Sequence, residues 1–341
     1  MAVVGEHTWC AATVVATDLV ATDVHRVVLE PADPAYPRRV PPGAHLDVRV
    51  SVDGRPDIRS YSVVDTSEDG RRIALSVHRS ATSRGGSRYI TDLAAGSRIE
   101  VSRPLQNFPL GVGAQRYVLV AGGIGITAIA AMAAALRARR ADYTLIYAGR
   151  SRAAMAYLDR LAADHGDRLR VHVADEGTRV DVDALLDEIA GQAASTELYL
   201  CGPIPLMDAV REGWALRGLP ATNLRFETFG NSGSFAPEPF VVRVPRLGVE
   251  VTVEEHTSML DALARAGVQV MSDCGKGECG LCLVPVLGVE GRLDHRDVFL
   301  SPREHAAGHQ LCACVSRAVS ADTAGQPTDA ATVAVVTIDV P

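Results

Sequence analysis

The chain has 341 residues, enough for two or three domains that each have a core of their own. Hydrophobic residues make up 47% of the sequence and charged residues 22%, which excludes a disordered or collagen-like chain. The formal net charge is -7, from 34 basic and 41 acidic residues, and this argues against nucleic acid or an anionic membrane as the main partner.

We expect a cytosolic protein. The first twenty residues contain Glu6 and Asp18 but no lysine or arginine, so the basic region of a secretory signal is missing. Residues 117–136 are uncharged and long enough to span a bilayer. Three glycines interrupt this stretch, however, and we predict a buried strand, a turn and a helix instead. Seven cysteines, an odd number, indicate metal ligands or redox groups rather than disulfides.

Within the first two thirds of the chain, the pattern of predicted secondary structure changes near residue 112. Up to about residue 110, short apolar runs separated by glycine, proline and aspartate predict a small antiparallel β-barrel or sandwich. From about 112 to 230, strands alternate with Ala/Leu/Arg-rich helices, which predicts a parallel sheet with right-handed crossovers. The strands expected in this sheet are 117–120, 143–147, 169–173 and 197–200.

The last third begins with residues 231–239, which are rich in glycine, serine and proline and are predicted to be a linker. A hairpin of 240–245 and 249–253 follows, and then a helix from about 258 to 266. After a cysteine-rich loop, residues 321–332 are predicted to be a polar loop and 333–340 a final strand.

Three cysteines of that loop, Cys274, Cys279 and Cys282, have the spacing Cys-x4-Cys-x2-Cys, with a further cysteine far downstream. This is the pattern of a plant-type [2Fe–2S] ferredoxin. The three glycines between them would allow positive φ angles and turn N–H groups towards the cluster sulfurs. A structural zinc site would more naturally offer two pairs of cysteines, and inert core cysteines would not stand among three glycines.

The fourth ligand is either Cys312 or Cys314, which are separated from Cys282 by 29 and 31 residues. Spacing does not choose between them, because a surface loop can vary in length. Two residues apart on a strand, both would face the same side. Cys10 and Cys201 stand alone and are predicted to be small core residues.

Two upstream motifs suit a flavin. Arg59-Ser60-Tyr61-Ser62 offers an arginine for a phosphate, an aromatic ring and a hydroxyl able to contact the flavin N5, although an Arg/Tyr pair is also an ordinary cross-strand contact. Arg84-Gly85-Gly86-Ser87 precedes a predicted helix at 88–93. Its backbone N–H groups would suit a phosphate, and the alternative is a plain turn.

Two later motifs suit a dinucleotide. Gly122-Gly123-Ile124-Gly125-Ile126-Thr127 lies at a predicted strand-to-helix junction, where glycines let a pyrophosphate approach the backbone. It is not G-x-G-x-x-G, so a standard Rossmann domain is not predicted. Cys201-Gly202-Pro203 ends another strand, at the edge where such sheets bind ligands. Arg150 and Arg152 follow the second strand, where they would bind a 2′-phosphate or simply be solvated.

Taken together, these residues resemble the phthalate dioxygenase reductase and vanillate demethylase reductase family of ferredoxin–NADP reductase-like flavoproteins, from about residue 10 to 320. The resemblance implies a multidomain fold with an antiparallel β-barrel for FMN at 1–111 and an α/β parallel-sheet NAD(P) domain at 112–230. The linker at 231–239 and an α+β (β-grasp) plant-type [2Fe–2S] ferredoxin domain at 240–341 complete it. Ala128 stands where the family usually has proline.

The resemblance also implies a set of cofactor-binding residues and no catalytic side chain, since the cofactors carry the chemistry. Those implied for FMN are Arg59, Ser60, Tyr61, Ser62, Val77, His78, Arg84, Gly85, Gly86 and Ser87, with Phe229 of the Phe226-Glu227-Thr228-Phe229 segment against the flavin. Those implied for the nicotinamide nucleotide are Gly122, Gly123, Gly125, Thr127, Cys201, Gly202 and Pro203. The implied cluster ligands are Cys274, Cys279, Cys282 and Cys314, because the family's fourth ligand directly precedes Val-Ser-Arg. Asp294-His295-Arg296-Asp297 also looks like a family signature.

The function that the resemblance implies is electron transfer. NADH would give a hydride to FMN, and single electrons would pass through the [2Fe–2S] cluster to a separate oxygenase, a Rieske non-haem iron oxygenase or O-demethylase by family analogy. A haem-thiolate monooxygenase is the alternative acceptor, and NADPH is the alternative donor. A non-catalytic iron–sulfur or zinc-binding interaction module is the alternative from another class.

Overall fold

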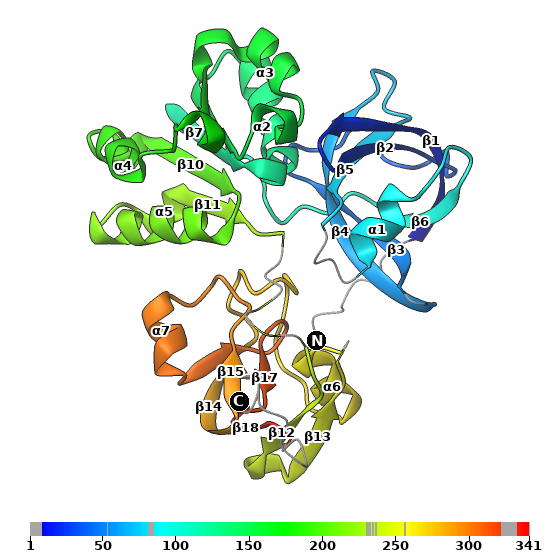
Figure 1. Ribbon diagram of the computed structural model, residues 1–341, viewed down its shortest axis with the longest axis vertical. Helices are drawn as coiled ribbons and strands as arrows, with labels where there is room; N and C mark the ends of the chain where they lie inside the picture. The colour runs from blue at the N-terminus through cyan, green and yellow to red at the C-terminus, as the bar shows by residue number, and fades with distance from the viewer. Residues whose placement is uncertain are drawn as a thin grey trace. The chain divides into compact units, whose positions relative to one another are not determined.

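The computed structural model describes residues 9–52, 54–80, 85–229, 233, 235, 237–255, 257–321 and 333–340. The chain divides into two compact units, Met1–Glu227 and Thr228–Pro341. Figure 1 colours the first unit from blue to green and the second from yellow to red.

The first unit begins with a closed barrel of six antiparallel strands, in the order β1-β2-β5-β4-β3-β6. Its strands are β1 (Trp9–Ala21), β2 (Val24–Pro31), β3 (His45–Val52), β4 (Arg55–Thr66), β5 (Ile73–His78) and β6 (Arg98–Ser102). Alternate residues, such as Leu46, Val48 and Val50 on β3, point into a common apolar core. The predicted barrel is confirmed. The short helix α1 (Gly86–Thr91) starts two residues earlier than predicted, directly after Gly85, whose φ is +96°.

A five-stranded parallel sheet in the order β11-β10-β7-β8-β9 completes the first unit. Its strands are β7 (Arg116–Gly122), β8 (Asp142–Gly149), β9 (Leu169–Val173), β10 (Thr196–Cys201) and β11 (Leu224–Glu227). The four predicted strands are all present. The strand β11 was not predicted. It is only four residues long, too short to show a clear apolar pattern, and it is defined by its pairing with β10.

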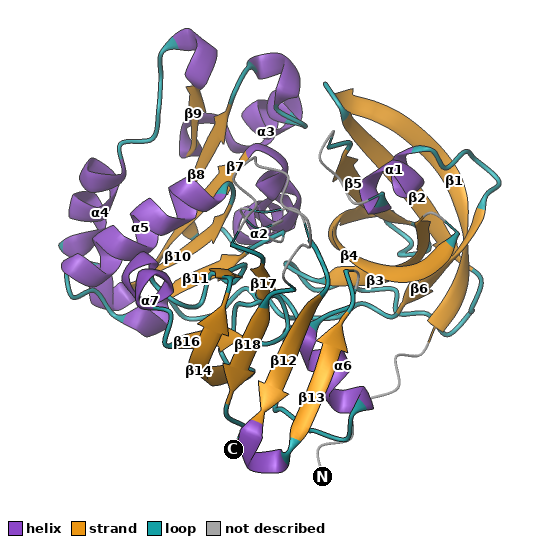
Figure 2. Ribbon diagram, turned by 60° about the horizontal axis from the view of Figure 1, so that its bottom comes forward, coloured by secondary structure: helices purple, strands orange, loops and turns teal. Residues whose placement is uncertain are grey.

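Helices cover both faces of this sheet (Figure 2). They are α2 (Ile126–Ala138), α3 (Leu158–His165), α4 (Val182–Ala190) and α5 (Ile204–Leu216). Because side chains alternate along a strand, Tyr117 and Leu119 of β7 pack with α2 and α3, and Val118 and Val120 pack with α4 and α5. The uncharged stretch 117–136 therefore forms a strand and a helix, as predicted. Within the described part of the chain, no helix is long and apolar enough to cross a membrane.

The second unit contains a five-stranded mixed sheet in the order β13-β12-β18-β14-β16. Its elements, with a small two-stranded sheet of β15 and β17, are β12 (Phe240–Val244), β13 (Val249–Val253), α6 (Met259–Arg265), β14 (Leu283–Glu290), β15 (Arg292–Asp294), α7 (Pro302–Ala307), β16 (Gln310–Cys312), β17 (Arg317–Val319) and β18 (Val335–Ile338). Helix α6 packs its buried Met259 and Leu263 on Phe240 and Val242 of the sheet. This arrangement confirms the predicted α+β ferredoxin fold.

Local signals positioned these elements correctly. Ser258 caps α6, since its Oγ accepts a hydrogen bond of 3.0 Å from the Asp261 N–H. The predicted hairpin is β12 and β13, and the predicted final strand is β18. The polar loop predicted at 321–332 lies outside the described residues except for Ala321, and so does much of the predicted linker, at 231, 232, 234 and 236.

Candidate functional site

The motifs at residues 122–127 and 201–203 meet at the point where the strand order of the parallel sheet reverses. The chain runs from β7 outward to β8 and β9 on one side, and β10 and β11 lie on the other. Cys201 at the end of β10 pairs with Ala121 near the end of β7. Ligands of open α/β sheets bind at the carboxyl ends of the strands at this switch point.

Glycine is required here because the two backbones nearly touch. A Cβ on Gly125 would lie 2.2 Å from the carbonyl oxygen of Cys201, and a Cβ on Gly122 would lie 2.5 Å from Cδ of Pro203. Thr127 is buried, and its Oγ1 donates a 2.9 Å hydrogen bond to the Ile124 carbonyl, which closes the turn into α2. The result is a surface of bare backbone at the N-terminal end of a 13-residue helix, which suits a pyrophosphate.

Of the arginine pair after β8, the guanidinium of Arg152 is already engaged. Arg152 makes a bidentate pair with Glu176, with Nε–Oε1 and Nη2–Oε2 distances of 2.7 and 2.9 Å. This pairing holds the pKa of Glu176 below its usual value. The carbonyl of Arg150 accepts a 3.0 Å hydrogen bond from the Asp175 N–H, which joins the ends of β8 and β9. A cavity of about 420 Å³ adjoins Arg152, and its other lining residues include Val20, Met155, Tyr157 and Arg160.

The predicted flavin motif lies on β4 of the barrel. Tyr61 packs against the barrel core, and burial raises its pKa, so the phenol stays neutral. Ser60 is exposed, and its Oγ donates a 2.6 Å hydrogen bond to Oδ1 of Asp47 on β3. Val63 of β4 pairs with Leu75 of β5, which brings Val77 to the same end of the strands as Tyr61. Val77 is buried and His78 is exposed.

A group of polar atoms next to this motif has the character of a phosphate site. Arg59 lies over Gly86, since a Cβ on Gly86 would be 2.9 Å from its Cγ and Nε. One guanidinium nitrogen of Arg59 is 2.6 Å from Asp57 Oδ2. Ser87 Oγ is buried and has no hydrogen-bond partner among the described residues. A buried hydroxyl without a partner is costly, so this position fits an anion with acceptor oxygens. Arg84 lies outside the described residues.

Glu227 was given no role of its own in the sequence analysis. Ser62 on β4 and Glu227 at the end of β11 are both buried, and Ser62 Oγ donates a 3.3 Å hydrogen bond to Glu227 Oε2. This bond joins the barrel to the parallel sheet at the serine assigned to the flavin. The signal in the sequence that could have found Glu227 is an acidic residue at the carboxyl end of the last parallel strand.

Phe229 belongs to the second unit and is 46% exposed, and its contact with the flavin stays a prediction.

The cysteine loop of the second unit has the backbone geometry expected for a cluster. Its three glycines have φ angles of +62°, +73° and +74°. The N–H groups of Lys276 and Glu278 donate to Cys274 Sγ, at 3.4 and 3.3 Å. Two N–H groups of the loop thus point at a cysteine sulfur, and their contact with the cluster stays a prediction.

Both candidate fourth cysteines lie next to this loop. The neighbouring thiols lower the pKa of both loop cysteines, chiefly Cys314 for Cys274 and Cys312 for Cys282. The deprotonated thiol is the form that binds metal. The premise that both candidates share a strand is wrong, because β16 ends at Cys312 and Cys314 lies in the turn after it.

Three protein-family models match the chain in the order expected. They are an oxidoreductase FAD-binding domain at residues 11–109, an oxidoreductase NAD-binding domain at 119–212 and a 2Fe-2S iron-sulfur cluster binding domain at 242–319. The predicted flavin, nucleotide and cluster domains are thus confirmed as classes. The barrel model is described as FAD-binding, so FMN stays a prediction.

Similar proteins extend this result over most of the chain. Phenoxybenzoate dioxygenase subunit beta of Ectopseudomonas oleovorans is 37% identical over 283 residues, which are 82% of this chain and 85% of that protein. The solved structure of phthalate dioxygenase reductase is 30% identical, has a TM-score of 0.73 and covers 98% of both chains. The chain belongs to the phthalate dioxygenase reductase family.

This reductase is also similar to part of a larger enzyme. An intact type IV self-sufficient cytochrome P450 monooxygenase is 36% identical, with a TM-score of 0.65 over 97% of this chain and 41% of that chain. The predicted oxidoreductase class is confirmed, and the alternative of a non-catalytic binding module is rejected.

The contact between the glycine motifs predicts a specific loss of nucleotide use. We expect Gly125→Ala to lower kcat/KM for NADH at least about tenfold, because the new Cβ would displace Cys201 and distort the surface that receives the pyrophosphate. Stopped-flow reduction of the bound flavin by NADH measures this directly. Gly191→Ala is the matched control, since a Cβ there meets no atom within 4 Å. Equal kinetics for Gly125→Ala and the parent protein would contradict the assignment.

Proposed function

We propose that this chain is the NADH-dependent reductase of a multicomponent oxygenase, working in the cytosol. It takes a hydride onto FMN and passes single electrons through a [2Fe–2S] cluster to a separate oxygenase of the Rieske type. The observation that carries the proposal is the presence in one chain of a dinucleotide surface at the sheet's switch point and a thiol loop with cluster geometry. NADH supplies two electrons at once and the cluster accepts one, so a flavin is the converter that such a chain needs.

The proposed domains are the FMN barrel at 1–111, the nucleotide domain at 112–230, the linker at 231–239 and the ferredoxin at 240–341. The three matched ranges, 11–109, 119–212 and 242–319, fall inside them. Within these domains the chain's own residues bind and orient. The backbone at Gly122–Thr127 and Gly202 would receive the pyrophosphate, and Tyr61 would flank the flavin ring. Ser62, whose Oγ donates to Glu227, would face the flavin N5.

FMN is the proposed flavin because the polar groups here suit a single terminal phosphate. Arg59 lies against Gly86, and Ser87, the next residue, has a buried Oγ without a partner among the described residues. Chromatography of the flavin released by heat identifies it: FMN is expected, and FAD would overturn this part of the proposal.

NADH is the proposed donor because of Glu176. A 2′-phosphate near Arg152 would have to compete with a carboxylate that already holds the guanidinium by two hydrogen bonds. The carboxylate would also repel the phosphate.

The acceptor is proposed from the relatives. The phenoxybenzoate and phthalate proteins are named for dioxygenases, which favours a Rieske-type partner for this chain. Similarity to the reductase part of a self-sufficient P450 makes a haem-thiolate monooxygenase the second candidate.

Reconstitution tests the function. The purified reductase is mixed with NADH and either a Rieske oxygenase or a haem-thiolate monooxygenase, and product formed per NADH is measured. Product with the Rieske enzyme is expected, and product with the haem enzyme alone would overturn the Rieske assignment. Cys279→Ala is expected to abolish product but to keep NADH-dependent reduction of ferricyanide, which can take electrons from the flavin. A protein that NADH does not reduce would overturn the whole proposal.

A second prediction concerns the fourth cluster ligand, for which we propose Cys314. It is supported by its place beside the cysteine loop: the next residue, Val315, lies against Gly277, where a Cβ would be 2.7 Å from Val315 Cγ2, whereas Cys312 is fully buried on β16 and paired with Leu283. Cys312→Ala is expected to retain two irons per chain and Cys314→Ala to lose them, as measured by iron and sulfide analysis. The reverse result would assign the ligand to Cys312.

A third prediction concerns nucleotide choice. Glu176→Gln removes the charge that occupies Arg152, and we expect kcat/KM for NADPH to rise by about tenfold while that for NADH changes little. Glu188→Gln is the control, because Glu188 pairs in the same way with Arg170 and with Arg116 at the opposite end of the sheet. An unchanged NADPH rate in Glu176→Gln would remove Glu176 from the account of specificity.

A further inference from the structure

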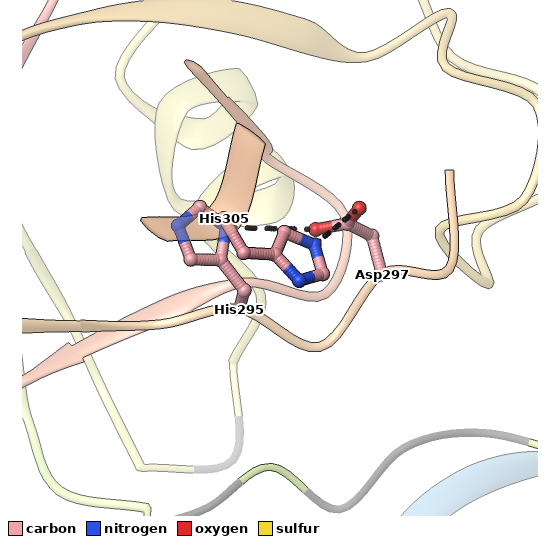
Figure 3. A group of neighbouring side chains, drawn as sticks. All are labelled: His295, Asp297 and His305. Carbon is pink, nitrogen blue, oxygen red and sulfur yellow. Dashed lines mark hydrogen bonds and ion pairs between the residues drawn. The ribbon is translucent and has the colours of Figure 1, made fainter. Parts of the chain in front are cut away.

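Two histidines and an aspartate of the second unit converge outside the cysteine loop. His295 and Asp297 follow β15, and His305 lies on α7 (Figure 3). One potential ligand atom from each side chain lies within 4.8 Å of the other two. His305 Nε2 is 3.1 Å from Asp297 Oδ2, and His295 Nδ1 is 3.7 Å from Asp297 Oδ1. Each carboxylate oxygen therefore faces a different imidazole.

The His295 ring lacks the partners that a buried imidazole needs. Its side chain is 8% exposed, and neither Nδ1 nor Nε2 hydrogen-bonds to any described residue. The distance of 3.7 Å to Asp297 is too long for a hydrogen bond. In the neutral ring one nitrogen carries a lone pair and the other carries a hydrogen. A lone pair that faces a carboxylate oxygen is repelled by it, and a cation between the two atoms would reverse this repulsion.

The carboxylate between the rings is held in place as a metal ligand would be. Asp297 is fully buried; its Oδ2 accepts 2.9 Å from the Leu300 N–H, and its Oδ1 accepts 3.3 Å from Ser316 Oγ. These two hydrogen bonds fix the direction of both carboxylate oxygens. Asp297 is thus an oriented oxygen donor, of the kind that outer hydrogen bonds support in metal sites.

The third side chain provides access. His305 is 27% exposed at its side chain, so an ion can enter from its side. Helix α7 is fixed by a capping box, in which Ser301 Oγ accepts from the Glu304 N–H and Glu304 Oε2 accepts from the Ser301 N–H. His305 follows directly after this cap, so its ring is presented from a fixed turn.

We propose that His295, Asp297 and His305 bind one divalent ion of the zinc type, at a site separate from the four-cysteine cluster. Two imidazoles and one carboxylate are a common donor set for Zn²⁺, with a fourth position left for water. Zn–N and Zn–O bonds of about 2.0 Å set the donor atoms roughly 3.3 Å apart, so a small inward turn of the partly exposed His305 completes the site. None of the residues assigned to flavin, nucleotide or cluster takes part.

The site borders the cysteine loop. A Cβ on Gly277 would lie 2.8 Å from Asp297 Cα, and the Val298 N–H donates a 3.0 Å hydrogen bond to the Gly277 carbonyl. A bound ion would therefore fix the segment that packs on the loop between Cys274 and Cys279.

The test uses the holoprotein, dialysed against a mild chelator and then equilibrated with ZnCl2. We expect one zinc per chain at micromolar free Zn²⁺ with both irons retained, as measured by mass spectrometry of the metals. His305→Ala is expected to weaken zinc binding at least 100-fold. His309→Ala is the matched control, since His309 is an exposed histidine four residues further on, and it should bind zinc normally.

A second readout is thermal. Zinc is expected to raise the melting temperature of the parent protein and of His309→Ala, and to leave that of His305→Ala unchanged. Absence of zinc binding at 100-fold higher Zn²⁺ would overturn the proposal and leave a histidine–aspartate ion pair. Equal zinc binding by His305→Ala, or zinc that rises only as iron is lost, would assign the zinc to the cysteines and overturn it as well.

Discussion

Close contact between two backbone segments, which any side chain would prevent, shapes the candidate sites of this reductase. In the first unit the turn after β7 meets the carbonyl of Cys201 at the end of β10, and only glycine at position 125 leaves room for it. In the second unit Gly277 lies against Asp297 and Val315. Both contacts lie in segments proposed to receive a charged group, so in this proposal packing and binding depend on the same missing Cβ.

Two carboxylates hydrogen-bond to side chains of the proposed nucleotide and flavin sites. Glu176 occupies the guanidinium of Arg152, which would otherwise serve a 2′-phosphate. Glu227 holds the serine that is assigned to the flavin N5, and it does so from a different sheet. In the proposed function the cofactors carry the electron chemistry, and these acidic side chains would select which nucleotide is bound and how the flavin lies.

In the second unit, the cysteine loop packs against the His295–Asp297–His305 group through Gly277 and Asp297. The loop provides soft thiol ligands with N–H groups aimed at sulfur, and the other group provides two imidazoles and one carboxylate. These donor sets suit different metals, an iron–sulfur cluster and a zinc-type ion. The two groups border each other where the Val298 N–H donates a hydrogen bond to the Gly277 carbonyl.

The sequence alone determined the three classes of domain, four of the five strands of the parallel sheet and the chemistry of the cysteine loop. It could do so because period-2 alternation, glycine positions and Cys-x4-Cys-x2-Cys spacing are local properties of the chain. Only the tertiary structure decided that Ser62 meets Glu227, that Arg152 is held by Glu176, and that His305 joins His295 and Asp297. Partners of this kind come from separate elements, and their pairing depends on strand order and helix packing, which no local pattern of residues encodes.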